Sequence, residues 1–297
     1  MSDTFKDSRD ARARLISKDK IGVVIYRENP LYDYFSRDQR ADAVLIREGS
    51  IRHIGESEID EEFSTFTGPD YCLASPHYEF RDGKTCTSGT DKWFEYPLFQ
   101  EQRVIMEEKK AMSNIVDSIV SEMTLDDTEI SIARSIRERI IGSGYSLYYD
   151  PITAFDENTL KVWNRPEEKS LRKVMYVEIA AKKGGLTILY SNSFLASSEE
   201  KYIEKYRRNI EAIELLKKNF FEGKSTSELS KILEEFRNPK LYLTTPLYPF
   251  NYTPIPGDEK SIRTRSLAVF DIWNLSSDFS FRRKVTAIAG NYRATVI

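Results

Sequence analysis

Hydrophobic and polar positions follow different patterns in the first third of the chain and in the rest. The first 100 residues predict short strands and loops, with β-branched runs at Ile21–Tyr26 and Ala43–Arg47. The second run continues through Glu48-Gly49 into residues 51–54, which is the pattern of a β-hairpin. Gly and Pro pairs punctuate residues 66–98. The sequence therefore predicts a small mixed sheet in residues 1–100 and a second domain in residues 101–297.

The second domain opens with a helical pattern. Apolar residues from Gln102 onward recur at spacings of three and four, which predicts a long amphipathic helix. A second helix is predicted from Asp127 or Thr128 to Gly142, where a glycine ends it. Strands are then predicted at 174–181 and 186–190 because both runs are rich in apolar residues and flank a Lys-Lys-Gly-Gly turn.

The same order of elements recurs later in the chain. Ser197-x-x-Glu200 and Ser225-x-x-Glu228 have the capping-box pattern, and each precedes a predicted helix. Strands are predicted at 267–273 and 285–289. We interpret this order as an internal duplication, in which two α+β halves pair their sheets and carry helices on one side. Chance similarity between amphipathic helices is the alternative.

The charge balance argues against a polyanionic partner. Lys and Arg number 44 and Asp and Glu number 47, so the net charge is −3 and nucleic acid is not expected as a ligand. No stretch reaches the roughly 20 apolar residues that a membrane span needs, so no membrane partner is expected either. The first residues lack an apolar signal core, from which we expect a cytoplasmic protein.

Histidine and cysteine are scarce and confined to the first third of the chain. The two histidines are His53 and His77, and the two cysteines are Cys72 and Cys86, for which reduced thiols are expected. The last 200 residues therefore contain no Ser-His-Asp triad, no Cys-His pair and no zinc site with a histidine ligand. Any reaction there must run without histidine as base or metal ligand.

Three stretches, Tyr34–Gly49, Glu107–Asp117 and Val177–Gly185, resemble the creatinase, aminopeptidase P and prolidase family. The resemblance implies an α+β fold. Residues 101–297 would form a pita-bread domain, which is a duplicated helix-helix-hairpin. A smaller mixed α/β domain of the creatinase type would precede it, and the protein would be a homodimer.

Active metallopeptidases of this family bind two divalent metals through two Asp, one His and two Glu, and the metals activate the attacking water. Carried over to this chain, the resemblance places Glu178 at the first Asp, and Leu189 or one of the two residues after it at the second. The histidine region corresponds to residues 244–251, which contain none. Asp271 corresponds to the first Glu, and Lys284 lies near the position of the last.

These correspondences imply a degenerate metal site. Leu189 offers no ligand and Lys284 would repel a cation. If Lys284 lies between Glu178 and Asp271, its charge could occupy the former cation position in a buried cluster of salt bridges. The alternative is that these residues never meet. The histidine that serves creatinase as acid and base is replaced by Trp163 or by the asparagine after it.

The leading hypothesis is a pseudoenzyme that needs no cofactor and retains a cleft for a peptide or protein. Its aromatic binding residues would be Trp163, Tyr248, Phe250 and Tyr252. The first alternative is an active Xaa-Pro dipeptidase or aminopeptidase, or a related C–N hydrolase, with Mn or Co in a carboxylate-only site. That site would combine Glu178 and Asp271 with some of Asp150, Asp156, Glu157 and Asp258. The second alternative is a purely structural or oligomerisation protein.

Overall fold

The computed structural model describes residues 3–19, 22–27, 32–36, 41–55, 71–74, 99–124, 126–161, 163–234, 240–245, 248–254 and 267–296. The chain divides into two compact units. Unit 1 comprises Met1–Ile105, Gly184–Leu186 and Pro246–Tyr248. Unit 2 comprises Met106–Lys183, Thr187–Thr245 and Pro249–Ile297.

Unit 1 contains a four-stranded mixed sheet. Strand β1 pairs antiparallel with β2 and parallel with β4, and β3 pairs antiparallel with β2. The predicted hairpin between β2 and β3 is confirmed, and its turn places Glu48 and Gly49 at φ angles of 51° and 77°. The strands are β1 (Gly22–Tyr26), β2 (Ala43–Arg47), β3 (Ser50–Ile54) and β4 (Tyr71–Ala74).

Unit 1 also contains helices that the sequence pattern did not predict. The expectation of only strands and loops is wrong for α1 (Asp3–Ile16), η1 (Ser17–Asp19) and the short α2 (Tyr32–Phe35). The reason is that the buried face of α1 includes Arg9 and Arg12, which interrupt its apolar spacing. Arg12 forms a buried ion pair with Glu101, and the Tyr34 hydroxyl donates to the same carboxylate at 2.7 Å.

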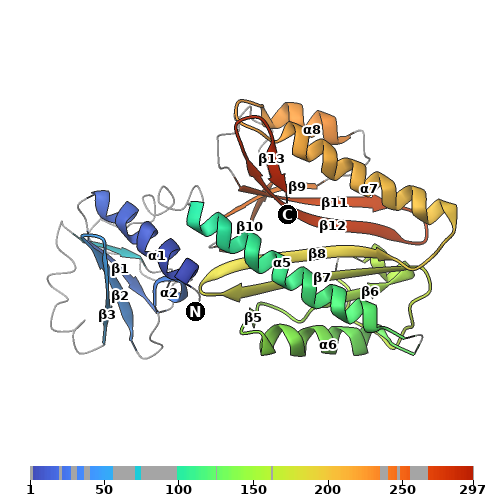
Figure 1. Ribbon diagram of the computed structural model, residues 1–297, viewed down its shortest axis with the longest axis horizontal. Helices are drawn as coiled ribbons and strands as arrows, with labels where there is room; N and C mark the ends of the chain where they lie inside the picture. The colour runs from blue at the N-terminus through green and yellow to red at the C-terminus, as the bar shows by residue number, and fades with distance from the viewer. Residues whose placement is uncertain are drawn as a thin grey trace. The chain divides into compact units, whose positions relative to one another are not determined.

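Unit 2 repeats one order of elements, two helices followed by strands (Figure 1), as the sequence predicted. Helix α5, which begins within unit 1, opens the first half. That half consists of α5 (Phe99–Glu122), α6 (Glu129–Gly142), β5 (Ser146–Leu147), β6 (Ile152–Phe155), η3 (Asp156–Leu160), β7 (Val174–Lys183) and β8 (Leu186–Leu195). The second half consists of α7 (Glu200–Asn219), α8 (Thr226–Glu234), β9 (Lys240–Thr245), β10 (Tyr248–Pro254), β11 (Leu267–Leu275), β12 (Ser280–Ala289) and β13 (Ala294–Val296).

One of the two predicted capping boxes forms. At the start of α8 the Glu228 amide donates to the Ser225 hydroxyl and the Ser225 amide donates to the Glu228 carboxylate, each at 3.1 Å. The box predicted at Ser197 is wrong, because α7 has its N-cap at Glu199. The Ala196 amide donates to the Lys173 carbonyl at 2.8 Å, so the preceding chain stays extended and the helix begins later.

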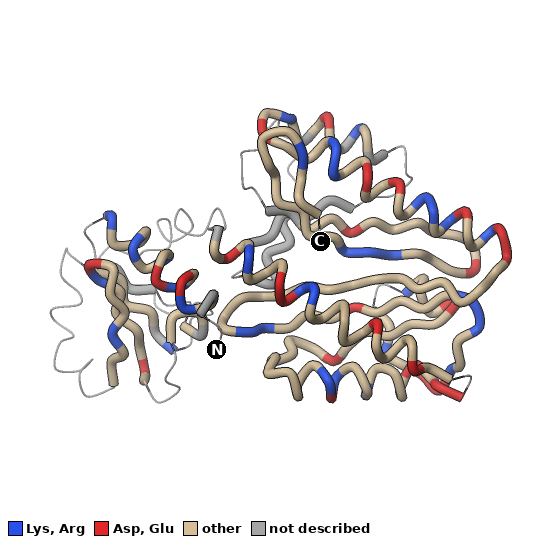
Figure 2. Tube along the Cα trace, viewed as in Figure 1, with Lys and Arg blue, Asp and Glu red and all other residues tan. Residues whose placement is uncertain are grey.

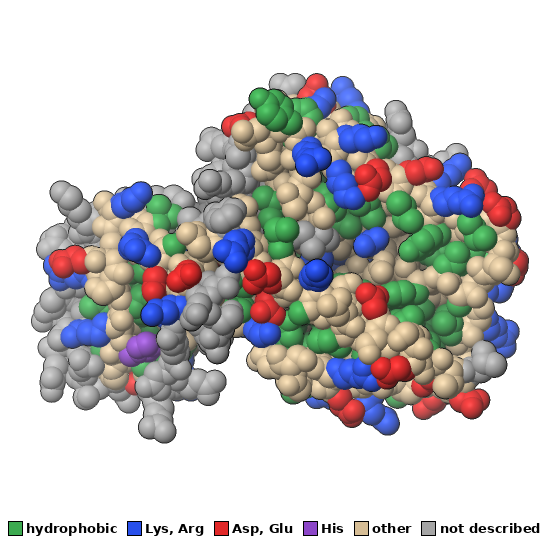
Figure 3. Space-filling view, in the orientation of Figure 1, with side chains coloured by type: hydrophobic (Ala, Val, Ile, Leu, Met, Phe, Trp, Pro, Cys, Tyr) green, Lys and Arg blue, Asp and Glu red, His purple; other side chains and the backbone are tan. Residues whose placement is uncertain are grey.

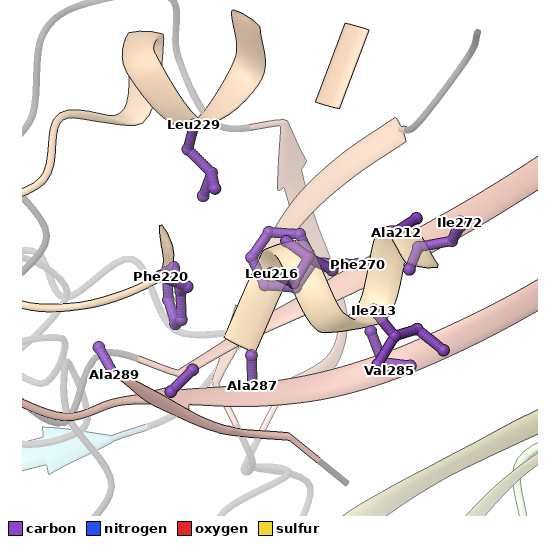
Figure 4. Packing of buried hydrophobic residues seen from close by; sticks show 11 residues of the cluster. Ala212, Ile213, Leu216, Phe220, Leu229, Phe270, Ile272, Val285, Ala287 and Ala289 are labelled. Atoms are coloured by element: carbon purple, nitrogen blue, oxygen red, sulfur yellow. The ribbon is translucent and has the colours of Figure 1, made fainter. Parts of the chain in front are cut away.

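The two halves form two sheets. In the first sheet β7 is central, with β5 and β6 along one edge and β8 along the other. The second sheet has the order β10-β9-β11-β12-β13. Helix α7 covers this second sheet by packing Ile213 and Leu216 against Phe270 and Val285 (Figure 4). None of the helices in the described ranges combines the length and apolar content needed to cross a membrane.

Serine side chains join the two sheets. The Arg282 amide donates to the Ser193 hydroxyl at 2.8 Å, and that hydroxyl donates to the Arg282 carbonyl at 2.7 Å. Two residues along each strand, the Lys284 amide donates to the Ser191 hydroxyl at 2.6 Å. Between these segments of β8 and β12, serine hydroxyls therefore satisfy main-chain groups that a continuous ladder would have paired.

Candidate functional site

Glu178 on β7 is the centre of a buried polar cluster in unit 2. Its side chain is 2% exposed. One carboxylate oxygen, Oε1, accepts hydrogen bonds from the Tyr149 hydroxyl at 2.7 Å and from Lys284 Nζ at 2.5 Å. The other oxygen, Oε2, accepts from the Tyr176 hydroxyl. Both oxygens of this carboxylate are therefore engaged by donors of the chain itself.

Asp271 on β11 is held by Arg282 on β12. The Arg282 Nε donates to the two Asp271 oxygens at 3.0 and 3.1 Å, and its Nη2 donates to Oδ2 at 2.6 Å. The same Nη2 lies 3.9 Å from Glu178 Oε2, so this guanidinium bridges both carboxylates. Its carbon also lies 4.5 Å from the ring centre of Trp273 and 5.3 Å from that of Tyr176. We name Glu178, Asp271, Arg282 and Lys284 the central ion cluster.

Strand geometry explains how the cluster assembles. Asp271 pairs with Lys284 in the antiparallel register of β11 and β12, and Trp273 pairs with Arg282. Side chains two residues apart on a strand share a face, so both cations of β12 lie on the same side as Asp271. Figure 2 shows the basic run that this segment of β12 forms. The other carboxylate of the cluster, Glu178, lies on β7 of the first sheet, so the cluster also links the two halves.

The electrostatics of the cluster are balanced internally, with two carboxylates facing two cations. Burial raises the pKa of Glu178, but Lys284 and Arg282 outweigh it and hold the pKa below its ordinary value. Burial and the neighbouring Glu178 charge raise the pKa of Tyr176, so this hydroxyl stays protonated as a donor. Buried ion pairs are stable only when such geometry offsets the loss of hydration.

Leu189 lies beside this cluster as part of an apolar wall. It is buried and packs with Ala180 and Val269. These two residues stand two positions from Glu178 and Asp271 on their strands, which places them on the same faces. The ring of Tyr149, whose hydroxyl donates to Glu178, packs against the same wall. The structure thus brings all four degenerate metal-site positions of the sequence analysis into one region.

The metal pair that the family resemblance implies does not fit these residues. A dinuclear centre needs several converging oxygen or imidazole ligands with free lone pairs. Here the oxygens of Glu178 and Asp271 already accept hydrogen bonds from Lys284 and Arg282. Leu189 has no donor atom, and two fixed positive charges would oppose a divalent cation within a few ångströms. The donor set is that of a closed ion-pair cluster.

Other carboxylates proposed for a carboxylate-only site have local partners. Asp150 pairs with Arg137 at 3.3 Å, and Glu157 pairs with Lys169. Asp156 accepts hydrogen bonds from main-chain amides of residues 172–174. Asp258 lies outside the described residues. Throughout the described ranges, no group of three or more His, Cys, Asp and Glu side chains is arranged to hold a metal ion.

Of the predicted aromatic binding residues, Trp163 lies near the cluster. Its side chain is 66% exposed and its ring centre lies 5.5 Å from that of Tyr149, in an edge-to-face arrangement. Since Tyr149 donates to Glu178, a single ring separates Trp163 from the cluster. Tyr248, Phe250 and Tyr252 lie on β10, and their side chains are outside the described part of the structure.

The sequence analysis missed three residues of the site. Arg282 stands two positions before Lys284, and Tyr176 two positions before Glu178, so strand alternation would have placed each beside its neighbour. The resemblance was applied only to the positions that correspond to metal ligands or to the creatinase histidine, and neither Arg282 nor Tyr176 is one of these. Tyr149 reaches Glu178 from the segment before β6, and no local pattern indicates that contact.

No protein-family model matches the sequence, and no curated protein matches it. Solved structures do match in fold. The X-Pro aminopeptidase from Thermotoga maritima MSB8 aligns with a TM-score of 0.73 at 14% identity, covering 97% of each chain. The prolidase from Pyrococcus horikoshii OT3 aligns with a TM-score of 0.68 at 14% identity, covering 99% of this chain and 97% of the prolidase. The Xaa-Pro dipeptidase from Bacillus anthracis gives 0.68 at 14% identity, with 97% and 96% covered. This chain has the pita-bread fold of the creatinase, aminopeptidase P and prolidase family.

Proposed function

We propose that this chain has the Xaa-Pro peptidase fold without metal-dependent hydrolase activity, and that it binds a peptide or protein beside the central ion cluster. The observation that carries the proposal is the pairing of Arg282 and Lys284 with the two carboxylates. Their charges take the role that metal ions have in the active enzymes of this family. The buried carboxylate of Glu178 stays ionised, because these cations lower its pKa, but no water is activated.

The loss of hydrolysis follows from the chemistry of the donors. Attack on a peptide bond at neutral pH needs an activated water and stabilisation of the oxyanion. An Arg–carboxylate pair can donate hydrogen bonds, but it does not lower the pKa of a water as a divalent ion does. The phenol of Tyr176, which faces Glu178, has its pKa raised by burial, so it stays protonated and offers no phenolate that could act as a base.

The binding role is supported by the exposed ring of Trp163. A large exposed aromatic side chain is a common anchor for peptide ligands, and proline rings pack well on indole faces. The ring of Tyr149 supports Trp163 through an edge-to-face contact, and the hydrogen bond from the Tyr149 hydroxyl to Glu178 fixes the orientation of the Tyr149 ring. A proline-containing peptide is therefore the ligand class that we propose for this surface.

The hydrolase half of the proposal is tested with purified full-length protein. We expect substoichiometric metal after gel filtration and no hydrolysis of Ala-Pro or Leu-Pro when Mn²⁺ or Co²⁺ is added. Stoichiometric metal that survives gel filtration together with dipeptide turnover would overturn the proposal. That outcome would establish the alternative, an active peptidase with an atypical carboxylate site.

The binding half is tested by tryptophan fluorescence and calorimetry with Xaa-Pro dipeptides and a proline-rich decapeptide. We expect saturable binding to the native chain and at least a fivefold loss in Trp163→Leu, because an exposed anchor contributes on the order of 1 kcal/mol or more. Tyr292→Leu is the matched control, since Tyr292 is 87% exposed on a different segment. Equal affinity of the native chain and Trp163→Leu, or no binding of either probe, would refute this half.

A further inference from the structure

Unit 2 contains a second candidate site, a pocket of about 470 Å³ between α5 and the strands β8, β12 and β13. This volume is in the range of pockets that hold small molecules. Its lining residues are Met106, Glu107, Lys109, Lys110, Ser113, Tyr190, Ser191, Arg283, Lys284 and Val296. The pocket is distinct from the proposed peptide surface, since neither Trp163 nor Tyr149 lines it.

The lining of this pocket carries an excess of positive charge. Lys109, Lys110 and Arg283 form no ion pair within the described chain, whereas Lys284 is paired with Glu178. Glu107 is the one acidic side chain of the lining. Figure 3 shows basic side chains over the middle of α5 and over the neighbouring strand region on the face drawn. Like charges held together repel one another, so this arrangement favours an anion between them.

Two buried polar groups also face this pocket. The Lys109 side chain belongs to a residue only 5% exposed, and its Nζ donates to the Thr286 hydroxyl at 2.9 Å. Burial, followed by the nearby charge of Arg283, lowers the pKa of Lys109 to about 7. Tyr190 is 5% exposed and its hydroxyl has no hydrogen-bond partner of normal geometry among the described residues. Each group would gain from an anionic acceptor.

Part of the lining is an apolar wall. Met106 on α5 and Val296 on β13 contribute its side chains. A bare inorganic ion would leave this wall in contact with water. An anionic head on a small apolar body would cover both parts, and the pocket is large enough for a ring of five or six carbon atoms.

We propose that this pocket binds a small organic oxyanion, a phosphate ester or a carboxylate, whose charged head contacts Lys109, Lys110 and Arg283 and whose apolar part packs on Met106 and Val296. Lys284 belongs both to this lining and to the central ion cluster, but the inference rests on other residues than the peptide-binding role, because Trp163 and Tyr149 do not line the pocket. Bidentate geometry makes Arg283 the main orienting donor, while the two lysines act as point charges.

The test uses phenyl phosphate and benzoate as probes, with phenol as the neutral control, in calorimetric titrations of the full chain. We expect saturable binding of at least one anion, and binding of phenol at least tenfold weaker. A tighter complex with phenyl phosphate identifies the ligand as a phosphate ester, and a tighter complex with benzoate identifies a carboxylate. No saturation by either anion up to about 10 mM, near the weak limit for specific ligands, overturns the proposal.

Variants show whether the pocket is the binding site. Arg283→Gln and Lys110→Gln remove charges that are not fully buried, so both variants are expected to fold, as circular dichroism will check. Each substitution should weaken the binding of the anion by about five- to tenfold. Arg208→Gln and Lys217→Gln on α7 are matched controls, because both carry exposed charges and neither belongs to the lining. An equal loss in the control variants would mean general charge attraction and would refute the site.

Discussion

The central ion cluster makes a strong prediction about stability, which Arg282→Met tests. Methionine retains much of the side-chain length but removes the guanidinium that holds Asp271 and approaches Glu178. The two carboxylates would then face a single cation, Lys284. Since the residues of this cluster are largely buried, water cannot replace the lost donor without rearrangement of the strands.

The expected loss is large. Removal of one partner from a buried ion pair costs about 3–5 kcal/mol, because an uncompensated charge remains. The lost contact of Arg282 with the Trp273 ring, 4.5 Å from the guanidinium carbon, adds about 0.5–1 kcal/mol. We expect Arg282→Met to lower the free energy of unfolding of unit 2 by roughly 4 kcal/mol.

The assay is urea unfolding followed by tryptophan fluorescence and circular dichroism. Arg282→Met combined with Asp271→Asn should recover roughly half of the loss, because removal of both partners leaves no unpaired charge between them. Arg208→Met is the matched control. Arg208 pairs with Glu204 one turn away on α7, where both side chains are more than half exposed, so its loss should stay below about 0.5 kcal/mol.

Two results would refute this reasoning. If Arg282→Met costs no more than Arg208→Met, the guanidinium is hydrated and the cluster is not a closed one. If the double variant is as unstable as Arg282→Met alone, the loss arises from packing and not from an unpaired charge.

Three further predictions concern buried charged residues other than Arg282. The pKa of Glu178 is lowered in the folded chain, so its ionised carboxylate stabilises the fold above the unfolded pKa of about 4.3. This stabilisation disappears as the pH falls through the folded pKa. The difference in unfolding free energy between the native protein and Glu178→Gln should therefore shrink in acid. Lys109 has the same direction of pH dependence in a higher pH range. With a pKa of about 7 in the folded chain against 10.5 unfolded, the unfolded chain binds the extra proton, so stability relative to Lys109→Met should rise by up to about 5 kcal/mol from pH 7 to 10.5 in urea titrations; a constant difference would contradict the burial of this amine. Glu129→Gln should lower the free energy of unfolding by about 2–4 kcal/mol in the same assay. The buried carboxylate accepts hydrogen bonds from four N–H groups, whereas an amide group can accept only at its one oxygen. A loss below about 1 kcal/mol would contradict that geometry.

In unit 2 the sequence pattern predicted α5 to α8 and the strands β7, β8, β11 and β12, whose runs of apolar residues are long, but it did not predict β5, β6, β9, β10 or β13. In α6, residues 132, 133, 136 and 140 are buried at helical spacing, and all are Ile or Ala. The same reasoning failed for α1, where Arg12 is buried through its ion pair with Glu101. A partner that lies 89 positions away along the chain leaves no local signal.

The site was predictable to the extent that residue-by-residue resemblance carries positions across a fold. It indicated Glu178, Asp271 and Lys284, and the structure places them together. It did not indicate Arg282, although the alternation of a strand places that residue on the same face as Lys284. Contacts between sheets, such as that of Arg282 with Ser193, depend on how the two halves pack and have no counterpart in periodicity.

The position of the two cations explains how buried carboxylates from both halves of this fold are balanced by side chains of the chain itself. In a metal-bound pita-bread domain, carboxylates from both halves would repel one another if the cations were absent. Here Arg282 and Lys284 supply compensating charge from one strand, and the amides of the same residues bind the serines of β8. Charge balance and the junction of the sheets thus depend on the same short segment of β12. A single substitution that places a carboxylate at position 284 would leave Arg282 in place and Glu178 without its closest cation, so building a metal site here would require several coordinated changes.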